Sequence, residues 1–379
     1  MSARILHVAE PTVGGVPRYV ADLVGDQLAR GWDVSIATPK DGELATLLAG
    51  TGARVFPWKA RREPGSAVLI ETIRLAGIIR EAEPDVAHLH ASKAGLAGRL
   101  AIRGSVPTVF QPHAWSFEAL VGPMRGIAVA WERFAARWAD VVVCVSEAER
   151  IRGAANGIDA RWRVVANGID LDRFPAADAL ERRLARDRLG LNGGPVVVCV
   201  GRLCRQKGQD VLLEAWPAVE ALVPDANLFL IGGGPDEPEL ASRAADGVSL
   251  VGTRPDVRDW MAAADVVVAP SRWEGMSLAM LEAMAVGRSV VATDVPGARE
   301  AIDGNGAVVP VEEPDAIAAA VAERLLDPAR ADVEGREARR RAEAAHDFRL
   351  TAESIADVYE DVGRRSAAQP LDVAAPAAR

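Results

Sequence analysis

Short apolar runs rich in valine, isoleucine and leucine alternate with longer helical stretches along the chain. Such runs, bounded by turn-forming residues, are typical of buried strands. In the first half, strands are predicted at Arg4–Ala9, Asp33–Thr38, Arg54–Pro57, Asp85–Leu89, Thr108–Pro112, Val141–Ser146 and Arg163–Ala166. Helices are predicted at Val16–Arg30, Ala67–Glu81, Lys93–Arg103 and Ile127–Trp138. The alternation predicts a doubly wound parallel sheet of the α/β class, with ligands at the carboxyl ends of its strands.

The same alternation restarts after Gly194. Strands are predicted there at Val196–Val200, Leu228–Ile231, Ser249–Val251, Asp265–Ala269, Val290–Thr293 and Ala307–Val309. We therefore expect two Rossmann-like domains, at residues 1–166 and 167–351, that face one another across a cleft. The polar segment Asn167–Pro175 is interpreted as the hinge. Residues 365–379 are rich in alanine and proline, have little to bury, and are expected to be disordered.

A loop and helix in the second half have the features of an anion site. An apolar strand is followed by a loop with Glu274 and Gly275, and Ser277 is a good N-cap for a helix predicted at Leu278–Val286. Free backbone N–H groups and the helix dipole favour an anion at such a terminus. Glu282 is the only charge in this helix, so it either faces water or is a buried carboxylate that needs hydrogen-bond donors. Sugar or ribose hydroxyls would supply them.

Further candidate residues follow other predicted strands. Gly14 and Gly15 allow the backbone to approach a phosphate or sugar, or else form a tight turn. The dinucleotide fingerprint Gly-x-Gly-x-x-Gly is missing there, which argues against an NAD or FAD enzyme. His113 is either a structural histidine or a group that contacts a ligand. Arg202 and Lys207 suit a diphosphate leaving group, unless they are solvated surface cations.

The charge distribution is uneven between the two halves. The 379 residues have a net charge of −9, of which the first 166 residues contribute +3 and the remainder −12. Neither half has the dense basic stripe of a nucleic-acid-binding protein, so no nucleic-acid partner is expected. The slightly basic first half either faces an anionic membrane or phosphorylated acceptor, or reflects ordinary surface variation.

The sequence indicates a cytoplasmic protein, with peripheral contact at the inner face of the plasma membrane left open. The chain runs directly into a strand, so we expect no signal peptide. No apolar run approaches the ~18–20 residues that a membrane-spanning helix needs. Cys144, Cys199 and Cys204 lack metal-ligand spacing, and the first two are expected in the core.

One helical stripe has two interpretations. Ile127, Trp131, Phe134 and Trp138 recur at helical spacing and form either a membrane-surface face or a core face. We favour core packing for this stripe, and also for His88.

Two motifs together carry a family resemblance. Glu274-Gly275 and Glu282, two glutamates separated by seven residues, resemble the signature of the retaining glycosyltransferases of family 4, which have the GT-B fold. The arrangement of Arg202 and Lys207 is similar to the diphosphate clamp of that family. The resemblance covers nearly the whole chain, thinly in the first domain and closely in the second.

The resemblance implies a role for each candidate residue. Glu274 and His113 are the catalytic residues that face the donor sugar, and Glu282 binds the ribose. The nucleobase region lies at Thr253 and Arg254. The groups that bind the donor diphosphate are Arg202, Lys207, Gly14, Gly15, Gly275, Met276, Ser277 and Leu278.

The implied activity is transfer of a sugar from a UDP- or GDP-sugar to a hydroxyl of a glycan, lipid-linked or small-molecule acceptor, in bacterial cell-surface polysaccharide or lipid-linked glycan assembly. No metal and no other cofactor is implied. A last helix at residues 352–363 is expected to cross back onto the first domain. The family commonly has Phe-Gly where this chain has Met276-Ser277, which puts the sugar pocket in doubt. The alternatives are a sugar-nucleotide epimerase of the same fold, an α-glucan phosphorylase and a non-catalytic nucleotide-sugar binder.

Overall fold

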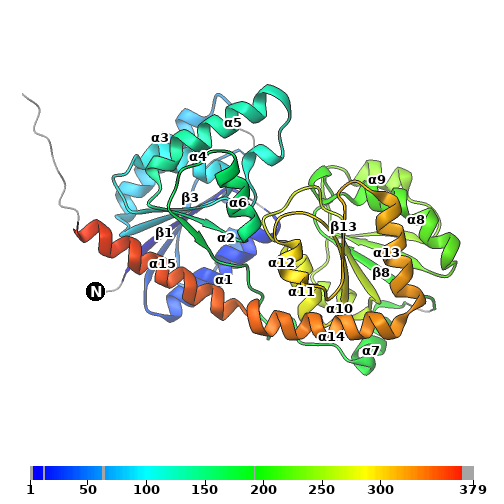
Figure 1. The fold of residues 1–379 in the computed structure, drawn as a ribbon. Helices are drawn as coiled ribbons and strands as arrows, with labels where there is room; N and C mark the ends of the chain where they lie inside the picture. Colours follow the sequence, from blue (N-terminus) through cyan, green and yellow to red (C-terminus); the bar gives the residue numbers. More distant parts are fainter. Residues whose placement is uncertain (1–2, 12, 62–64, 192, 369–379) are drawn as a thin grey trace, which may run out of the picture.

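The computed structural model describes residues 3–11, 13–61, 65–191 and 193–368. Two α/β domains lie side by side, and the C-terminal helices run along both of them (Figure 1). One sheet has seven parallel strands in the order β3-β2-β1-β4-β5-β6-β7, and the other has six in the order β10-β9-β8-β11-β12-β13. The strand order reverses at β1 and at β8, and the carboxyl ends of strands at such a switch point are where ligands bind. The predicted GT-B architecture is confirmed.

The first domain covers its sheet with helices on both faces. Its strands are β1 (Arg4–Ala9), β2 (Asp33–Thr38), β3 (Arg54–Pro57), β4 (Val86–His90), β5 (Thr108–Gln111), β6 (Val141–Cys144) and β7 (Trp162–Val164). Its helices are α1 (Gly15–Ala29), α2 (Glu43–Leu47), α3 (Val68–Ala82), α4 (Ala91–Ile102), α5 (Gly122–Ala135) and α6 (Glu147–Ala155), with short 3₁₀ turns at Ser116–Glu118 and Ala136–Trp138.

The second domain repeats this plan. Its strands are β8 (Val196–Val200), β9 (Asn227–Ile231), β10 (Val248–Gly252), β11 (Val266–Ala269), β12 (Ser289–Thr293) and β13 (Ala307–Val309). Its helices are α7 (Ala179–Leu189), α8 (Gln209–Leu222), α9 (Glu237–Arg243), α10 (Val257–Ala263), α11 (Leu278–Val286), α12 (Ala298–Ile302), α13 (Pro314–Leu326) and α14 (Pro328–Ala345), with a 3₁₀ turn at Arg205–Lys207.

The predicted elements form close to their predicted bounds, with local differences that have physical causes. β6 ends at Cys144 rather than Ser146, because the Ser146 hydroxyl caps α6 by accepting from the Glu149 N–H at 3.1 Å. β4 extends to His90, one residue beyond the prediction. α5 begins at Gly122, five residues early, because the proline in its first turn is already set for a helix.

The last helix, α15 (Phe348–Ala368), lies on the first domain. Its apolar face, including Ile355, Val358 and Val362, joins the core cluster that contains β1 and α1. The Tyr359 hydroxyl bonds His88, which is fully buried as predicted. The disordered tail predicted at 365–379 is wrong for residues 365–368, which are helical, and its remainder lies outside the described residues.

Two buried ion pairs hold α4 between its neighbours. Lys93 of α4 binds Glu71 of α3 at 2.9 Å, and Arg99 of α4 binds Glu132 of α5 at 2.7 Å. None of these four side chains is more than 3% exposed. The Arg99 guanidinium also lies 3.9 Å above the ring of Phe110. Charge, rather than an apolar seam alone, therefore fixes α3 and α5 against α4.

The core prediction for the aromatic stripe of α5 is wrong in part. Ile127 is 61% exposed and Phe134 is 44% exposed. Trp131 and Trp138 are half-buried and contact Phe134 through their rings. The helix turns its Glu132 face inward, because that carboxylate bonds Arg99, and its apolar stripe consequently faces outward.

The Arg99–Glu132 pair gives a prediction about stability. Arg99→Met should lower the stability of the first domain by about 3–5 kcal/mol, because it leaves the Glu132 carboxylate buried without its cation. The double variant Arg99→Met/Glu132→Leu should recover most of this loss. Thermal unfolding followed by circular dichroism measures both, with exposed Arg74→Met as the matched control. A double variant no more stable than the single one would contradict the buried-charge explanation.

Candidate active site between the two domains

The loop before α11 is the part of the second domain that packs against the first. The Gly275 carbonyl accepts a hydrogen bond from the Ser146 hydroxyl at 3.0 Å, and the Met276 carbonyl accepts one from the Asn167 amide at 2.9 Å. A Cβ at Gly275 would lie 2.6 Å from Val145. This approach is closer than any side chain permits, so glycine is required for the contact.

Lys207 and Glu274 meet at this cleft from two different loops. Lys207 follows β8 and Glu274 follows β11, and the Lys207 ammonium lies 2.5 Å from the Glu274 carboxylate. The Ser271 hydroxyl donates to the same oxygen of Glu274 at 2.9 Å. Burial opposes the charge on Lys207, but Glu274 outweighs it and raises the pKa of the lysine. The structure thus joins a cation and a carboxylate that the resemblance assigned to the diphosphate and to the sugar.

The N-termini of α1 and α11 meet at the same place. Gly14 has a φ of 105°, and a Cβ at Gly15 would lie 3.1 Å from the Leu278 side chain. Ser277 occupies the N-cap position of α11, but its side chain makes no capping hydrogen bond, contrary to its predicted role. α1 also lacks a side-chain cap. Two helix starts with uncapped backbone N–H groups therefore point at one region, which favours an anion there.

Glu282 lies on α11, one turn beyond this anion site. Its side chain is half-buried, and burial raises its pKa to about 7, although the nearby Arg173 and Arg18 oppose the rise. Arg173 is already bonded to Asp22 at 2.8 Å and to Asp170 at 3.0 Å. A desolvated carboxylate of this kind is stabilised by hydroxyl donors, which the two hydroxyls of a ribose provide.

His113 lies two residues beyond the end of β5, on the opposite wall of the cleft. Its φ is 56° and that of Ala114 is 121°, both unusual for residues with a side chain. The Glu149 carboxylate holds this turn by accepting from the Ala114 N–H at 2.8 Å. A Cβ at Gly275 would lie 3.1 Å from the His113 carbonyl carbon, so the two predicted site residues are neighbours. Burial lowers the pKa of His113 to about 3, and its imidazole is therefore neutral.

The remaining predicted residues differ in their surroundings. Arg202 is half-buried, and no carboxylate among the described residues lies within salt-bridge distance of it. Arg254 is exposed and forms a two-bond pair with Asp256 at 2.7 and 2.8 Å. Its charge is thus already paired with a carboxylate. Thr253 lies beside Gly233, with its hydroxyl 3.0 Å from the position of a Cβ there.

Four polar residues of the cleft were not identified from the sequence. Ser146 and Asn167 bind the Gly275–Met276 backbone, Glu149 supports the His113 turn, and Ser271 bonds Glu274. The Ser146-x-x-Glu149 spacing is that of a capping box, a signal that identifies a helix start but not a contact between domains. Burial raises the pKa of Glu149 to about 7, partly offset by the N–H groups of Val145 and Ala114.

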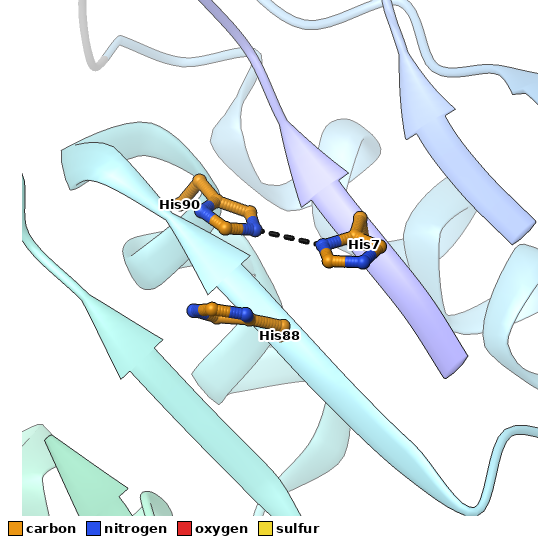
Figure 2. A group of neighbouring side chains, drawn as sticks. All are labelled: His7, His88 and His90. Carbon is orange, nitrogen blue, oxygen red and sulfur yellow. Dashed lines mark hydrogen bonds between the residues drawn. The ribbon is translucent and has the colours of Figure 1, made fainter. Parts of the chain in front are cut away.

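One group of side chains in the described part of the chain has the spacing of metal ligands. His7, His88 and His90 have nitrogens within 4.8 Å of one another on β1 and β4 (Figure 2). The His7 Nδ1 and the His90 Nε2 already form a hydrogen bond of 2.9 Å. His88 Nδ1 lies 2.6 Å from the Tyr359 hydroxyl. Both nitrogens of His7 and of His90 are thus hydrogen-bonded, whereas the buried Nε2 of His88 has no partner in the described part of the chain.

Comparison with known proteins identifies the family. Residues 13–173 match the model of Glycosyltransferase Family 4, and residues 194–327 match that of Glycosyl transferases group 1. The chain is similar to the GDP-mannose-dependent alpha-(1-6)-phosphatidylinositol monomannoside mannosyltransferase of Mycolicibacterium smegmatis, at 34% identity over 95% of this chain and 97% of that one. The mannosyltransferase of that name from Mycobacterium tuberculosis is 30% identical, with 92% and 94% covered.

Solved structures agree at the level of the fold. The Anabaena protein HepE in complex with UDP and glucose superimposes with a TM-score of 0.81 at 23% identity, covering 94% of this chain and 99% of that chain. Sucrose-phosphate synthase from Thermosynechococcus elongatus gives 0.82 at 22% identity, covering 97% and 100%. The chain belongs to the family 4, or group 1, glycosyltransferases, and it is therefore an enzyme of sugar transfer from nucleotide sugars.

Glu282 gives a prediction about the pH dependence of stability. Its folded-state pKa of about 7 lies above the ordinary value of 4.5, so its ionisation costs stability progressively between pH 4.5 and pH 7. Glu282→Gln should therefore raise stability by about 1–2 kcal/mol at pH 8, after allowance for solvent screening, and leave it unchanged at pH 4. Thermal unfolding at both pH values checks this, and an equal effect at the two values would contradict it.

Proposed function

We propose that this enzyme transfers a sugar with retention of configuration from a nucleotide diphosphate sugar to a hydroxyl of a membrane glycolipid. The contact between Lys207 and Glu274 beside two uncapped helix starts carries the donor part of the proposal. In a nucleotide sugar the anomeric carbon is attached directly to the diphosphate, so a phosphate-binding cation and a sugar-facing carboxylate have to be neighbours. The named mannosyltransferase relatives use GDP-mannose, and we extend that donor to this chain.

The proposed chemistry assigns one task to each group. As the anomeric C–O bond breaks, negative charge grows on the leaving diphosphate, and Lys207, Arg202 and the helix N–H groups stabilise it. Glu274 faces the positive charge that develops on the sugar ring, and Glu282 accepts from the ribose. His113, being neutral, accepts a hydrogen bond from a hydroxyl of the donor sugar. Lys207 and Arg202 supply to the diphosphate the positive charge that a divalent metal would otherwise supply. We therefore propose transfer without a metal or other cofactor.

Contacts between the domains support transfer rather than hydrolysis. The Glu300 carboxylate of α12 accepts from the backbone N–H groups of Glu147 and Ala148 at 2.9 and 2.7 Å, at the start of α6 in the other domain. Together with the Gly275 contact, this brings the two walls of the cleft together. A closed cleft excludes the water that competes with the acceptor for the activated sugar.

A hollow next to Glu274 is the proposed entrance for the acceptor. It has a volume of about 210 Å³, and its lining comes from both domains. Trp273 precedes Glu274, while Phe117, Glu118, Arg125 and Arg152 belong to the first domain. Arg125 lies in the first turn of α5, so this helix contributes to the lining of the hollow. Aromatic rings and paired charges of this kind suit the polar headgroup of a sugar-bearing lipid.

The outward faces of α3 and α5 are the proposed membrane contact. Of the described residues, the large apolar side chains exposed on these two helices and at the α5 N-cap are Leu69, Ile70, Ile73, Val121, Met124, Ile127 and Phe134. The exposed charged residues on the same segments and the following 3₁₀ turn are Arg74, Arg80, Glu81, Arg125, Arg133 and Arg137. An apolar surface bordered by arginines complements an anionic lipid surface.

The buried ion pairs explain how this surface is maintained. Glu71 and Glu132 point inward to Lys93 and Arg99, which leaves the apolar sides of α3 and α5 outside. In the described part of the chain, no helix is both long and apolar enough to cross a bilayer. We therefore propose a peripheral association with the inner face of the plasma membrane, where a glycolipid acceptor and a soluble nucleotide sugar can meet.

A nucleotide panel tests the donor site. GDP at 100 times its Kd should stabilise the protein by about 2.7 kcal/mol. Lys207→Met and Glu282→Gln should each abolish most of this effect, whereas Lys40→Met, an exposed lysine of the first domain, should retain it. Thermal shift with GDP, UDP, ADP and NAD measures the effect, and EDTA should not change it. Equal stabilisation of all variants would refute the donor site, and turnover of GDP-mannose without acceptor would favour an epimerase.

Vesicle sedimentation tests the membrane surface. Leu69→Ser/Ile73→Ser and Met124→Ser/Ile127→Ser should each weaken binding to phosphatidylglycerol vesicles at least tenfold, because a buried aliphatic side chain is worth about 1.5–3 kcal/mol. The control Leu222→Ser/Leu326→Ser changes two equally exposed leucines of the second domain and should bind normally. Binding that is insensitive to lipid charge, or equal loss in the control, would contradict the proposal.

A further inference from the structure

A row of hydrogen bonds leads from the core of the first domain to His113. Gln27 Oε1 lies 2.9 Å from His7 Nε2, His7 Nδ1 lies 2.9 Å from His90 Nε2, and His90 Nδ1 lies 3.1 Å from His113 Nε2. Gln27 belongs to α1, His7 to β1 and His90 to β4, so three elements build it. Figure 2 shows the hydrogen bond between His7 and His90. Gln27, His7 and His90 are at most 2% exposed. Only His113, at its end, is partly open to the cleft.

The imidazoles in this row are all neutral. Burial lowers the pKa of His7 to about 4 and that of His113 to about 3, and it lowers the pKa of His90 well below the ordinary value. A neutral imidazole has one N–H donor and one acceptor nitrogen. Each ring must therefore donate on one side and accept on the other, so all the bonds of the row point in the same direction.

Gln27 sets that direction. Its amide oxygen can only accept, which makes His7 Nε2 the donor and His7 Nδ1 the acceptor. His90 then donates to His7 from Nε2, and His113 donates to His90 from Nε2. By elimination, the Nδ1 of His113 carries no proton.

Gln27 takes part in the row through its oxygen alone, because its buried amide nitrogen has no hydrogen-bond partner among the described residues. His88 lies outside the row. Its Nδ1 is 2.6 Å from the Tyr359 hydroxyl, and its Nε2 has no partner in the described part of the chain. The direction of the row therefore follows from the Gln27 oxygen that faces His7, and the tautomer of each ring tests it.

We infer that Gln27 and His7, acting through His90, hold His113 in its Nε2–H tautomer, so that Nδ1 is a permanent hydrogen-bond acceptor at the cleft. This inference deepens the proposed function, in which His113 receives a hydroxyl of the donor sugar. Gln27, His7 and His90 are positioning residues, since none of them reaches the cleft. The buried row explains why His7 and His90 lie in a sheet core, where apolar side chains are the rule. No proton is transferred along it in this state.

A metal on His7, His88 and His90 is the competing explanation of the cluster. It would require ring nitrogens that now bond one another and Tyr359 to turn their lone pairs toward one point. The hydrogen-bond row instead requires no change in the orientation of the rings. The two explanations differ in one observable, because a bound Zn²⁺ ion would remove the proton that His90 donates to His7.

Nitrogen NMR of the ligand-free protein tests the row. In protein labelled with ¹⁵N-histidine, two-bond ¹H–¹⁵N spectra report the tautomer of each ring, and His113→Gln assigns the signal of interest. We expect His7, His90 and His113 in the Nε2–H form. Gln27→Met removes the acceptor at the start of the row, so His113 should shift toward Nδ1–H. Gln27→Glu restores an acceptor and should restore the Nε2–H form.

The matched control is Gln111→Met, another fully buried glutamine, which bonds Tyr19 at 3.1 Å and lies outside the row. It should leave the His113 tautomer unchanged. An Nδ1–H tautomer of His113 in the wild type would overturn the inference, as would an unchanged tautomer in folded Gln27→Met. Stoichiometric Zn²⁺ binding that eliminates the His7 and His90 signals would overturn it as well. The wild-type spectrum decides the question even if the variants do not fold.

The kinetic readout depends on the proposed function, and the NMR readout does not. With GDP-mannose and an acceptor, Gln27→Met should lower kcat about tenfold, with the KM for the donor changed less than twofold. Gln27→Glu should recover most of the rate. If the tautomers are as expected but no sugar is transferred, the proposed function fails and the positioning row stands. If the rate falls without a tautomer change, the row is overturned.

Discussion

The approach of Gly275 to the first domain is the constraint on which the site depends. A side chain there would meet Val145 at 2.6 Å, and the carbonyl would no longer reach Ser146. This contact places the N-terminus of α11 against the first domain, and with it the Glu274 carboxylate. The remaining donor groups follow, because Lys207 is held by Glu274 and Leu278 lies against Gly15. A single residue without a side chain thus aligns groups from two separately folded sheets.

The first domain places polar groups where a domain of its size usually places apolar ones. Histidines form the centre of its sheet around β1 and β4, and ion pairs join α4 to α3 and α5. Buried polar groups of this kind are costly unless they are paired, and the pairs Lys93–Glu71, Arg99–Glu132 and His7–His90 supply that pairing. The consequences reach the surface on both sides. At the cleft, the histidine row sets the tautomer of His113. On the outer face, the ion pairs leave apolar side chains of α3 and α5 exposed.

Membership of the glycosyltransferase family concerns the donor, whereas the individual features of this chain's first domain concern the acceptor. The second domain provides Lys207, Glu274 and the start of α11, which form the proposed donor site, and its motifs carried the resemblance. The first domain provides the hollow beside Trp273 and the arginine-bordered apolar faces. Under the proposed function, one substrate comes from water and one from a membrane, and such a transferase needs both surfaces at a common edge. The first turn of α5 contributes to the hollow, and Ile127 and Phe134 of the same helix are exposed, which agrees with that proposal.

The sequence by itself determined the strands, their parallel arrangement in two domains and the helix at Leu278–Val286, because these depend on local periodicity and turn residues. It also indicated Glu274, Glu282, Arg202 and Lys207 as candidate site residues, through their positions after predicted strands and a family resemblance, and these assignments stay predictions. It did not reveal that Glu274 pairs with Lys207 or that Glu149 supports His113, since these partners are far apart in the chain. The outward stripe of α5 was likewise decided by tertiary structure. Helical spacing shows that two faces differ, but only a partner such as Arg99 decides which face turns inward.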